Sequence, residues 1–320
     1  MHTSRCVLQT AAARPGRAAR TARTLQRMDV RYEYRRYQAL GNDYIVVGED
    51  MTELLSEPAR IRRLCDRHIG LGSDGILLPT APPDGFAAAV RILNPDGSEA
   101  EKSGNGVRIF AKHCFDHLGT SPAQPLRIHT LGGAVSARLI VRERDRSVLS
   151  VTMGRASFRC EDLPMSAPGE WLQKDLECGG RVFPITAVSM GNPHAVIIGN
   201  APGAALDEET VRSFGPHIEN HPIFPQRTNV QFVRVVDREA VEAMIWERGA
   251  GWTLSSGSSA CAVVAACVRA GLTDRNVEVR MPGGELRVTI GGDWQVEQVG
   301  WVQELMTGVI ARELLASLAV

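Results

Sequence analysis

Short alternating or apolar runs follow one another along the chain and predict a series of β-strands. These strands are expected at residues 44–47, 88–93, 134–141, 182–188, 195–198, 230–236, 242–245, 277–281 and 286–290. Helical periodicity predicts helices at residues 57–66, 106–118, 208–214, 259–270 and 311–318. Only two of these helices are long and apolar, one in each half of the chain. The pattern therefore indicates an α+β fold in which a barrel-like mixed sheet surrounds each central helix.

Two motifs occur twice in the same order, which points to an internal duplication. Residues 40–47 resemble residues 190–197, at an offset of 150, and residues 103–107 resemble residues 256–260, at an offset of 153. Chance similarity of Gly-Asn strings explains any single match, but two ordered matches at nearly one offset favour two similar domains. The predicted units are 1–28, a basic arm; 29–149 and 150–305, the two domains; and 306–320, a closing segment packing on the first domain.

Basic charge is concentrated at the N-terminus. Residues 1–27 contain six Arg and no acidic residue, so the rest of the chain has thirty basic and thirty-six acidic residues, although the whole is neutral. The segment lacks the apolar core of a secretory signal, which leaves a transit peptide, a disordered arm, or a translated stretch upstream of Met28. The acidic body argues against nucleic-acid binding, and no apolar run reaches the about 20 residues of a membrane span.

The seven cysteines do not suggest a disulfide framework. Their number is odd, their spacing is irregular and no C-x-x-C occurs, so we expect free thiols and no metal site. This usage fits a reducing cytoplasm, or a plastid or other organelle if residues 1–27 are a transit peptide.

Two glycine-rich segments stand directly before the long apolar helices. They are Ser103-Gly-Asn-Gly106 and Ser256-Gly-Ser-Ser259, and their backbone N–H groups, with the positive end of each helix dipole, suit an anion. A capped helix is the simpler interpretation of one such motif, since Ser and Asn are good N-caps. Two motifs placed symmetrically by duplication favour a carboxylate held between facing helix ends.

Further polar residues stand at turns or at strand ends. They are Asn42, Asn94, Asn192, Asn229, Glu247 and Arg248. Each alone is explained as a turn residue. Together they offer amides, one carboxylate and one guanidinium, which suit the carboxylate and ammonium groups of an amino acid.

In combination, these motifs resemble diaminopimelate epimerase. The segments that carry the resemblance are Gly41-Asn-Asp-Tyr44, Asn94-Pro-Asp-Gly-Ser98, Gly104-Asn-Gly-Val-Arg108, Gly191-Asn-Pro-His-Ala195, Thr228-Asn-Val-Gln-Phe232 and Glu247-Arg-Gly-Ala-Gly251. They occur in the family's order between about residues 34 and 308.

The resemblance implies two similar α/β domains with the ligand in the cleft between them, and an amino-acid epimerase that needs neither pyridoxal phosphate nor another cofactor or metal. In that family two cysteines face each other across the substrate Cα: one removes a proton and the other returns one. By carry-over Asn42, Asn94, Asn192, Asn229, Glu247 and Arg248 would bind substrate, and Gly104, Asn105, Gly257 and Ser258 would supply the helix-end contacts. Members often form homodimers, which makes a second copy a candidate partner.

The sequence departs from the family pattern where the resemblance places the two cysteines. Ser103 and Ser256 occupy those positions, Ser259 replaces a glycine, and Trp252 stands where the family usually has Glu. Cys261 lies about one helical turn further inward and is not an obvious substitute. A serine hydroxyl is a much weaker acid than a thiol and needs a partner base.

Three hypotheses follow. The favoured one is an isomerase of diaminopimelate or a specialised-pathway analogue, with Ser103 and Ser256 as a changed catalytic pair and His194 as a candidate helper. The second is a lyase or dehydratase, since elimination needs only one base. The third is a catalytically inactive amino-acid-binding homologue. In each case the partner is a small amino acid.

Overall fold

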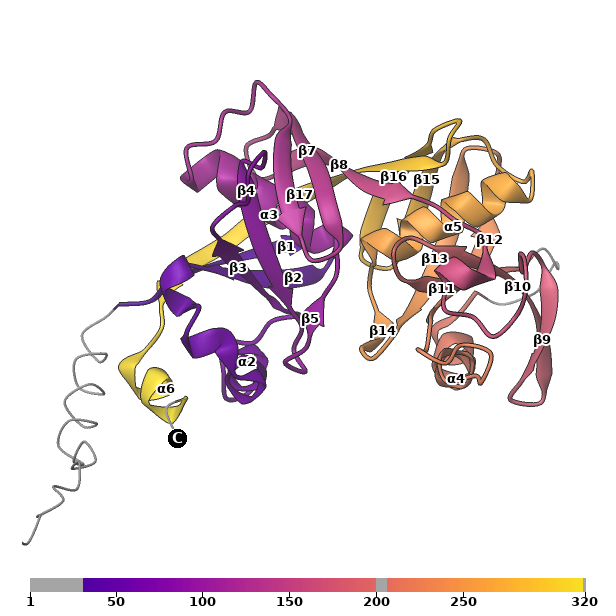
Figure 1. Ribbon diagram of the computed structural model, residues 1–320, viewed down its shortest axis with the longest axis horizontal. Coiled ribbons are helices and arrows are strands. Elements are labelled where there is room, and N and C mark those ends of the chain that lie inside the picture. The colour runs from indigo at the N-terminus through magenta and orange to yellow at the C-terminus, as the bar shows by residue number, and fades with distance from the viewer. Residues whose placement is uncertain (1–30, 200–205, 319–320) are drawn as a thin grey trace, which may run out of the picture.

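The computed structural model describes residues 31–199 and 206–318, and the arm predicted over residues 1–28 lies outside them. Two lobes lie side by side (Figure 1). Each lobe surrounds one long helix: α3 (Gly104–His117) in the first and α5 (Gly257–Arg269) in the second. Most residues of both helices are buried, as their apolar composition predicts.

Eight strands form a closed ring around α3. In ring order they are β1 (Glu33–Ala39), β2 (Asn42–Val47), β3 (Ile76–Thr80), β4 (Ala88–Leu93), β6 (Leu126–Thr130), β7 (Gly133–Arg142), β8 (Ser147–Arg155) and β17 (Gln295–Val309), and β17 pairs with β1. The parallel pairs β2–β3 and β4–β6 are joined by α2 (Pro58–Cys65) and α3, because a parallel connection needs a crossover. The two-residue strand β5 (Glu99–Ala100) pairs with β4 just before α3.

The second lobe repeats this plan around α5. Its ring contains β10 (Arg181–Ser189), β11 (Pro193–Gly199), β12 (Asn229–Val235), β13 (Ala240–Glu247), β15 (Asn276–Met281) and β16 (Gly284–Ile290), followed by β17 and β8. A bridge between Ser157 and Ser189 closes it. The parallel pairs β11–β12 and β13–β15 are again joined by helices, α4 (Glu208–Glu219) and α5. The predicted duplication and the barrel around each central helix are thus confirmed.

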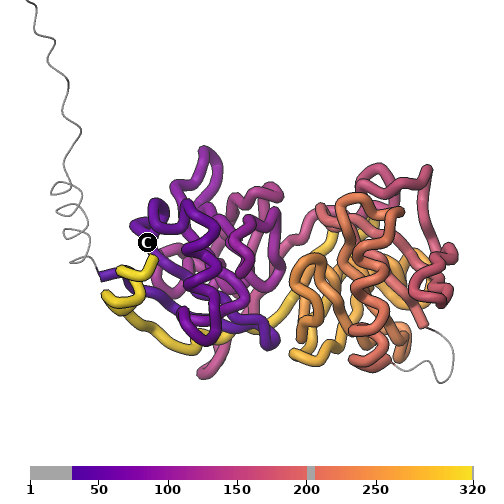
Figure 2. Tube along the Cα trace, turned by 90° about the horizontal axis from the view of Figure 1, so that it is seen from below, coloured from indigo at the N-terminus to yellow at the C-terminus, as the bar shows by residue number. Residues whose placement is uncertain are grey.

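Strand β17 belongs to both lobes. Residues 295–302 pair with β8, residues 296–299 also pair with β16, and residues 303–309 pair with β1 of the first lobe. Figure 2 shows this last part of the chain running from the second lobe along the first. Beyond it, α6 (Arg312–Ser317) ends the described chain, and Leu318 lies in an apolar cluster with residues of β2 and α2.

All nine predicted strands and all five predicted helices are present. The two central helices start two residues earlier than predicted, because Ser103 and Ser256 are their N-caps. Eight strands were not predicted: β1, β3, β5, β6, β8, β9 (Lys174–Cys178), β14 (Gly251–Thr253) and β17. Several of these contain polar residues at inward positions, which weakens an alternating signal. Within residues 31–199 and 206–318, three short 3-10 helices complete the fold, at Glu49–Met51, Leu54–Ser56 and Cys160–Asp162. Among the described helices, none has the length and apolar character needed to cross a membrane.

A side chain at Gly300 would crowd the crossing of β17. A Cβ at this position would lie 2.4 Å from Leu286 Cδ2 and 3.2 Å from Arg108 Cζ. We therefore expect Gly300→Ala to lower the free energy of unfolding by about 1–3 kcal/mol through overpacking. Urea unfolding measures it, with Gly292→Ala as the matched control, since a Cβ there meets nothing within 4 Å. Equal stability of the two variants would contradict this packing.

A candidate active site between two helix ends

The N-termini of α3 and α5 meet where the two lobes touch. A Cβ on Gly104 would lie 3.0 Å from Gly257 Cα, and one on Gly257 would lie 2.9 Å from Gly104 Cα. Only glycine allows this approach. Because both helices direct their positive ends into one place, the site favours an anion. The predicted facing of the two glycine-rich motifs is therefore present in the structure.

Each of the two serines caps its own helix. Ser103 Oγ accepts a hydrogen bond from Gly106 N at 3.1 Å, and Ser256 Oγ accepts one from Ser259 N at 3.4 Å. The hydroxyls differ in their second neighbours. The Tyr44 hydroxyl lies 3.1 Å from Ser103 Oγ, whereas the Ser256 side chain lies near the carboxyl group of Glu247 and favours its charged form.

The groups beside the serines carry shifted pKa values. Burial raises the pKa of the Tyr44 hydroxyl, so it remains protonated at neutral pH. Burial also raises the pKa of Glu247, against the opposing effect of the nearby Ser256 hydroxyl. Glu247 is therefore a better proton acceptor than an ordinary carboxylate, and it stands beside one serine only.

A chain of amides links the two lobes behind the helix ends. Asn105 Nδ2 donates to Asn42 Oδ1 at 3.3 Å and to Ser255 Oγ at 3.2 Å. Ser255 Oγ in turn donates to the backbone carbonyl of Leu40 at 2.8 Å. Asn42 Nδ2 donates to Asp74 Oδ2 at 2.9 Å, which fixes the orientation of its amide. Asn42 and Asn105, predicted as separate site residues, thus belong to one hydrogen-bonded network.

Arg108 adds a buried positive charge one turn into α3. Its Nη2 donates to Asn105 Oδ1 at 2.5 Å, while Nε and Nη1 have no hydrogen-bond partner in the described chain. The side chain is fully buried, which lowers its pKa to about 10. Since that value still leaves the guanidinium charged at neutral pH, Arg108 strengthens the positive potential at the helix ends.

His194 holds a neighbouring amide in place. Gln231 Nε2 donates to His194 Nδ1 at 3.0 Å, and His194 Nε2 lies 2.9 Å from Asn192 Oδ1, so the ring carries its proton on Nε2. Burial lowers the pKa of His194 to about 3, which makes it a weak base at neutral pH. Its contacts therefore favour a positioning role over that of the predicted helper in proton transfer. Gln231 Nε2 also donates to Ser259 Oγ at 3.0 Å. This hydrogen bond accommodates the serine that stands where the resemblance places a glycine.

The remaining predicted residues lie at strand ends. Asn229 Nδ2 donates to the Pro193 carbonyl at 2.9 Å, and Asn229 Oδ1 accepts from Arg248 N at 3.0 Å. The Arg248 guanidinium lies 3.8 Å from Glu101 of the other lobe. Asn94 is the exception among the predicted residues. Its side chain donates to Ser98 Oγ within its own turn, and its described contacts do not join it to the helix ends.

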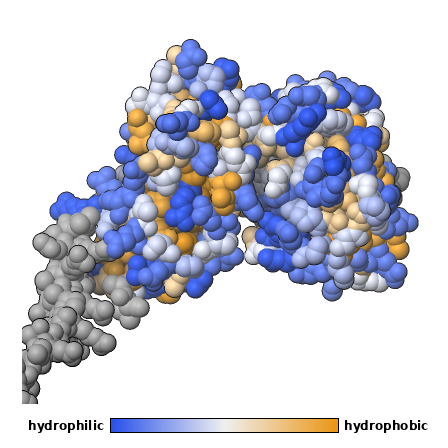
Figure 3. All heavy atoms as spheres, in the orientation of Figure 1, coloured by the Kyte–Doolittle hydropathy of each residue, from blue (hydrophilic) through white to orange (hydrophobic). Residues whose placement is uncertain are grey.

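A cavity of about 90 Å³ lies beside the meeting point of the helices. Its lining comes from both lobes: Glu101, Lys102, Gly132, Met153, Met190, Gly191, Asn192 and Ser258. The molecular surface is notched between the two lobes in the view of Figure 3. The cavity includes Asn192 and Ser258 but not Trp252, which lies 5.5 Å from the guanidinium of Arg212 of α4 and packs with the second lobe's core.

Gln298 was missed by the sequence analysis. It stands on β17 at an inward position, fully buried, and a Cβ on Gly104 would lie 2.2 Å from its Nε2. Its polar character in the run Val296, Gln298, Gly300, Val302 was the available signal. Tyr44, Ser255 and Asp74 were also missed as site residues, because their roles depend on contacts between distant segments.

Cys261 is no thiolate replacement for the serines. Burial raises its pKa to about 12, so the thiol is protonated at neutral pH. Its neighbours Arg108 and Lys102 only partly offset this effect.

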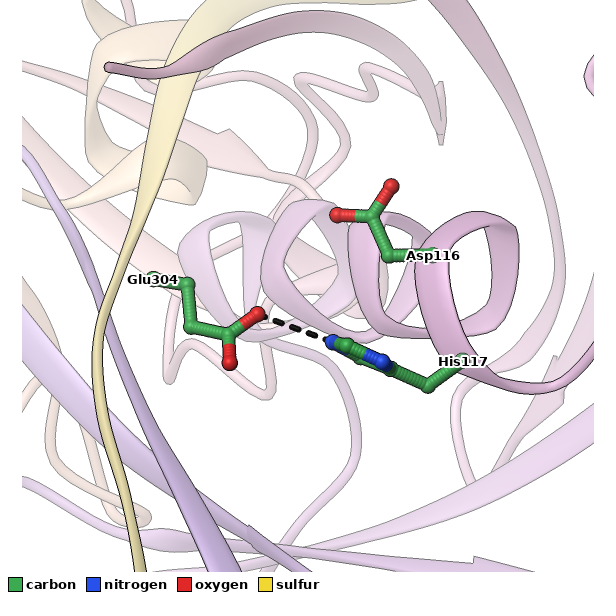
Figure 4. Close-up of side chains that lie close together, drawn as sticks. All are labelled: Asp116, His117 and Glu304. Carbon is green, nitrogen blue, oxygen red and sulfur yellow. Dashed lines mark hydrogen bonds and ion pairs between the residues drawn. The ribbon is translucent and has the colours of Figure 1, made fainter. Parts of the chain in front are cut away.

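Among the described residues, one cluster has metal-ligand spacing, at the C-terminal end of α3. Asp116, His117 and Glu304 lie together there, and Figure 4 shows His117 bonded to Glu304. The carboxylates already have cationic partners. Asp116 pairs with Lys112 and Arg142, and Glu304 pairs with Arg35. This set is an ion-pair network remote from the two helix N-termini.

Comparison with known proteins agrees with this arrangement. The sequence model of the family Diaminopimelate epimerase matches residues 34–159 and 186–308, which include every predicted site residue. The chain belongs to the diaminopimelate epimerase family. It is 40% identical over 285 residues to diaminopimelate epimerase 2 of Nostoc sp., covering 89% of this chain and 97% of the relative. It is 40% identical over 274 residues to diaminopimelate epimerase of Pelotomaculum thermopropionicum, covering 84% and 95%.

Solved structures show the same fold at low sequence identity. A hydroxyproline epimerase from Agrobacterium vitis has a TM-score of 0.64 at 15% identity, covering 88% of this chain and 91% of that one. A phenazine biosynthesis protein from Bacillus anthracis has a TM-score of 0.61 at 13% identity, covering 88% and 99%. The epimerase family fold thus accounts for nearly the whole described chain.

The contact between the helix ends should not tolerate a methyl group. In Gly104→Ala the new Cβ would meet Gln298 Nε2 at 2.2 Å and Gly257 Cα at 3.0 Å, so the helix ends must separate. A misplacement of about 1 Å can reduce a rate about 100-fold. We expect Gly104→Ala to weaken amino-acid binding at least about tenfold in calorimetry, with Gly292→Ala unchanged. Unaltered binding would rule out the meeting point as the anion site.

His194 should remain neutral well below the ordinary histidine pKa of about 6.5. Since its folded-state pKa is about 3, the imidazole ¹⁵N shifts should stay those of the Nε2–H tautomer between about pH 5 and pH 8. The unfolded chain takes up this proton at higher pH than the folded one. His194 therefore lowers the free energy of unfolding as the pH falls from about 6.5 towards 3. A midpoint near 6.5 in the folded protein would exclude this environment.

Proposed function

We propose that this protein is a pyridoxal-phosphate-independent amino-acid epimerase that binds its substrate's α-carboxylate between the N-termini of α3 and α5. The approach of Gly104 to Gly257 is the observation that supports this most directly. Deprotonation at Cα sends negative charge into that carboxylate. Preorganised N–H groups at the helix ends and the buried cation of Arg108 would stabilise this charge.

Proton transfer would occur from the two sides that carry Ser103 and Ser256. A hydroxyl removes a proton only when a partner base assists it. On the second-lobe side this partner is Glu247, whose raised pKa suits it to accept and return a proton. On the first-lobe side the neighbour is the protonated Tyr44 hydroxyl, which can donate but is a poor acceptor. The two sides are therefore chemically unequal, unlike a pair of thiols.

Diaminopimelate is the first substrate candidate, because the family and the 40% identical relatives carry this name. The ammonium group would contact Glu247 and the amide oxygens around it. A cytoplasmic or other reducing location fits the six cysteines of the described chain, all buried and free. For its assembly, we propose that the protein forms a homodimer, as members of the family often do.

Hydrogen exchange at Cα tests the activity. The purified protein is incubated in D2O with an amino-acid panel that includes both stereoisomers of diaminopimelate, and the products are read by NMR and chiral chromatography. Deuterium at Cα with inversion is the expected result. Loss of water or ammonia would instead identify a lyase, and tight binding without exchange would identify an inactive homologue.

Restoring thiols should increase the rate. A thiol has a pKa near about 8.5 and loses its proton far more readily than a hydroxyl. We expect Ser103→Cys/Ser256→Cys to raise the exchange rate by about 10²- to 10⁴-fold, with Ser121→Cys as an exposed control. Failure of the double variant to bind any amino acid would show that the cleft is not an amino-acid site.

A further inference from the structure

Lys102, the residue before Ser103 in the sequence, lines the cavity between the lobes. It is a cavity-lining residue together with Asn192 and Ser258 of the other lobe. A Cβ on Gly154 of β8 would lie 3.7 Å from Lys102 Nζ, which places the amine beside this strand at ordinary contact distance. The backbone next to it is held by Gly132 N, which donates to the Glu101 carbonyl at 2.6 Å. The amine is thus positioned between the lobes rather than in open solvent.

The environment of Lys102 is unfavourable for a positive charge. It stands just before the N-terminus of α3, where a cation opposes the helix dipole. Over residues 31–199 and 206–318, its Nζ forms no ion pair or hydrogen bond with another side chain, since the nearby Glu101 carboxylate faces Arg248. The other titratable neighbour is Cys261 of α5, a protonated thiol. Burial consequently lowers the pKa of Lys102.

The choice of lysine is itself informative in this chain. Only three of the 36 basic residues are Lys, and the others are Arg. Lys112 is bound by Asp116 and Ser147, and Lys174 is exposed. An arginine holds its charge at any physiological pH, whereas a desolvated lysine can act as a neutral base. Of the three lysines, Lys102 is the one placed in the candidate active site.

We propose that Lys102 is the acid/base residue on the first-lobe face of the substrate, supplying the proton transfer that Ser103 cannot supply alone. The neutral amine removes the Cα proton and becomes an ammonium ion, while the C–H electron pair moves into the carboxylate between the helix ends. A proton from Ser256, replenished by Glu247, then reaches the opposite face of Cα. In the reverse direction the ammonium ion of Lys102 donates and the Ser256–Glu247 pair accepts. This assignment rests on the proposed epimerase function.

Variants at Lys102 separate proton transfer from charge. Lys102→Arg keeps the cation but not the base, so it should bind amino acid like the wild type yet lose about 100-fold or more in Cα exchange. Lys102→Ala should lose exchange equally and recover part of it with added ethylamine, in proportion to the free amine. Lys174→Arg, at an exposed position, is the matched control and should exchange normally. Thermal unfolding and calorimetric binding confirm that each variant is folded.

Chemical labelling provides an independent measurement on the wild-type protein. An amine-reactive reagent is applied across a pH series, and peptide mass spectrometry follows Lys102 and Lys174 separately. The modification of Lys102 should begin at lower pH than that of Lys174, and a bound amino acid should protect it.

The outcomes distinguish the two proposals. Wild-type exchange retained in Lys102→Arg, or a labelling profile of Lys102 that coincides with that of Lys174, overturns the role of Lys102 and leaves the epimerase function intact. Absence of exchange in the wild type with every amino acid overturns the proposed function, and the role of Lys102 with it.

Discussion

The close approach of two helix N-termini is the constraint on which the rest of the structure depends. Their positive ends repel each other. At positions 104 and 257 only glycine fits, because a Cβ on either residue would press against the backbone of the other. The strands β8 and β17 hold the lobes in this position, because each continues from its own lobe into the ring of the other. The fold thus maintains an arrangement that helix electrostatics alone would disfavour, and a bound carboxylate would relieve it.

The buried polar residues around this contact are arranged to hold donors in fixed directions. Asn105 and Asn42 are bonded to each other and across the lobe boundary, and His194 is held neutral between Gln231 and Asn192. Such networks stabilise a single geometry only when most members have partners. The unpartnered atoms of Arg108 and Gln298 are grouped near the helix ends, where a ligand would change their surroundings.

Hydroxyls stand where the resemblance places two thiols, so the proposed chemistry relies on neighbouring groups. A thiol can act as acid or base by itself, whereas in the proposed mechanism Ser256 would depend on Glu247, and the first-lobe side would rely on Lys102 beside Ser103 and Tyr44. The other departures from the family pattern are accommodated by packing. Ser259 accepts a hydrogen bond from Gln231, and Trp252 lies against Arg212 of α4. Ser259 and Trp252 therefore each have a partner within the second lobe.

The sequence by itself determined the duplication, the α+β class, the two central helices and the pairing of glycine-rich helix starts. These features follow from local periodicity, capping and repeated motifs, which are encoded within a few residues. Only the tertiary structure decided that β17 closes both rings, that Gln298 lies against Gly104, and that Asn94 bonds within its own turn. It also decided that His194 is buried and neutral, and that Lys102 faces a cavity shared by the lobes. Strand pairing and desolvation bring together residues far apart in the chain, so no local pattern could report them.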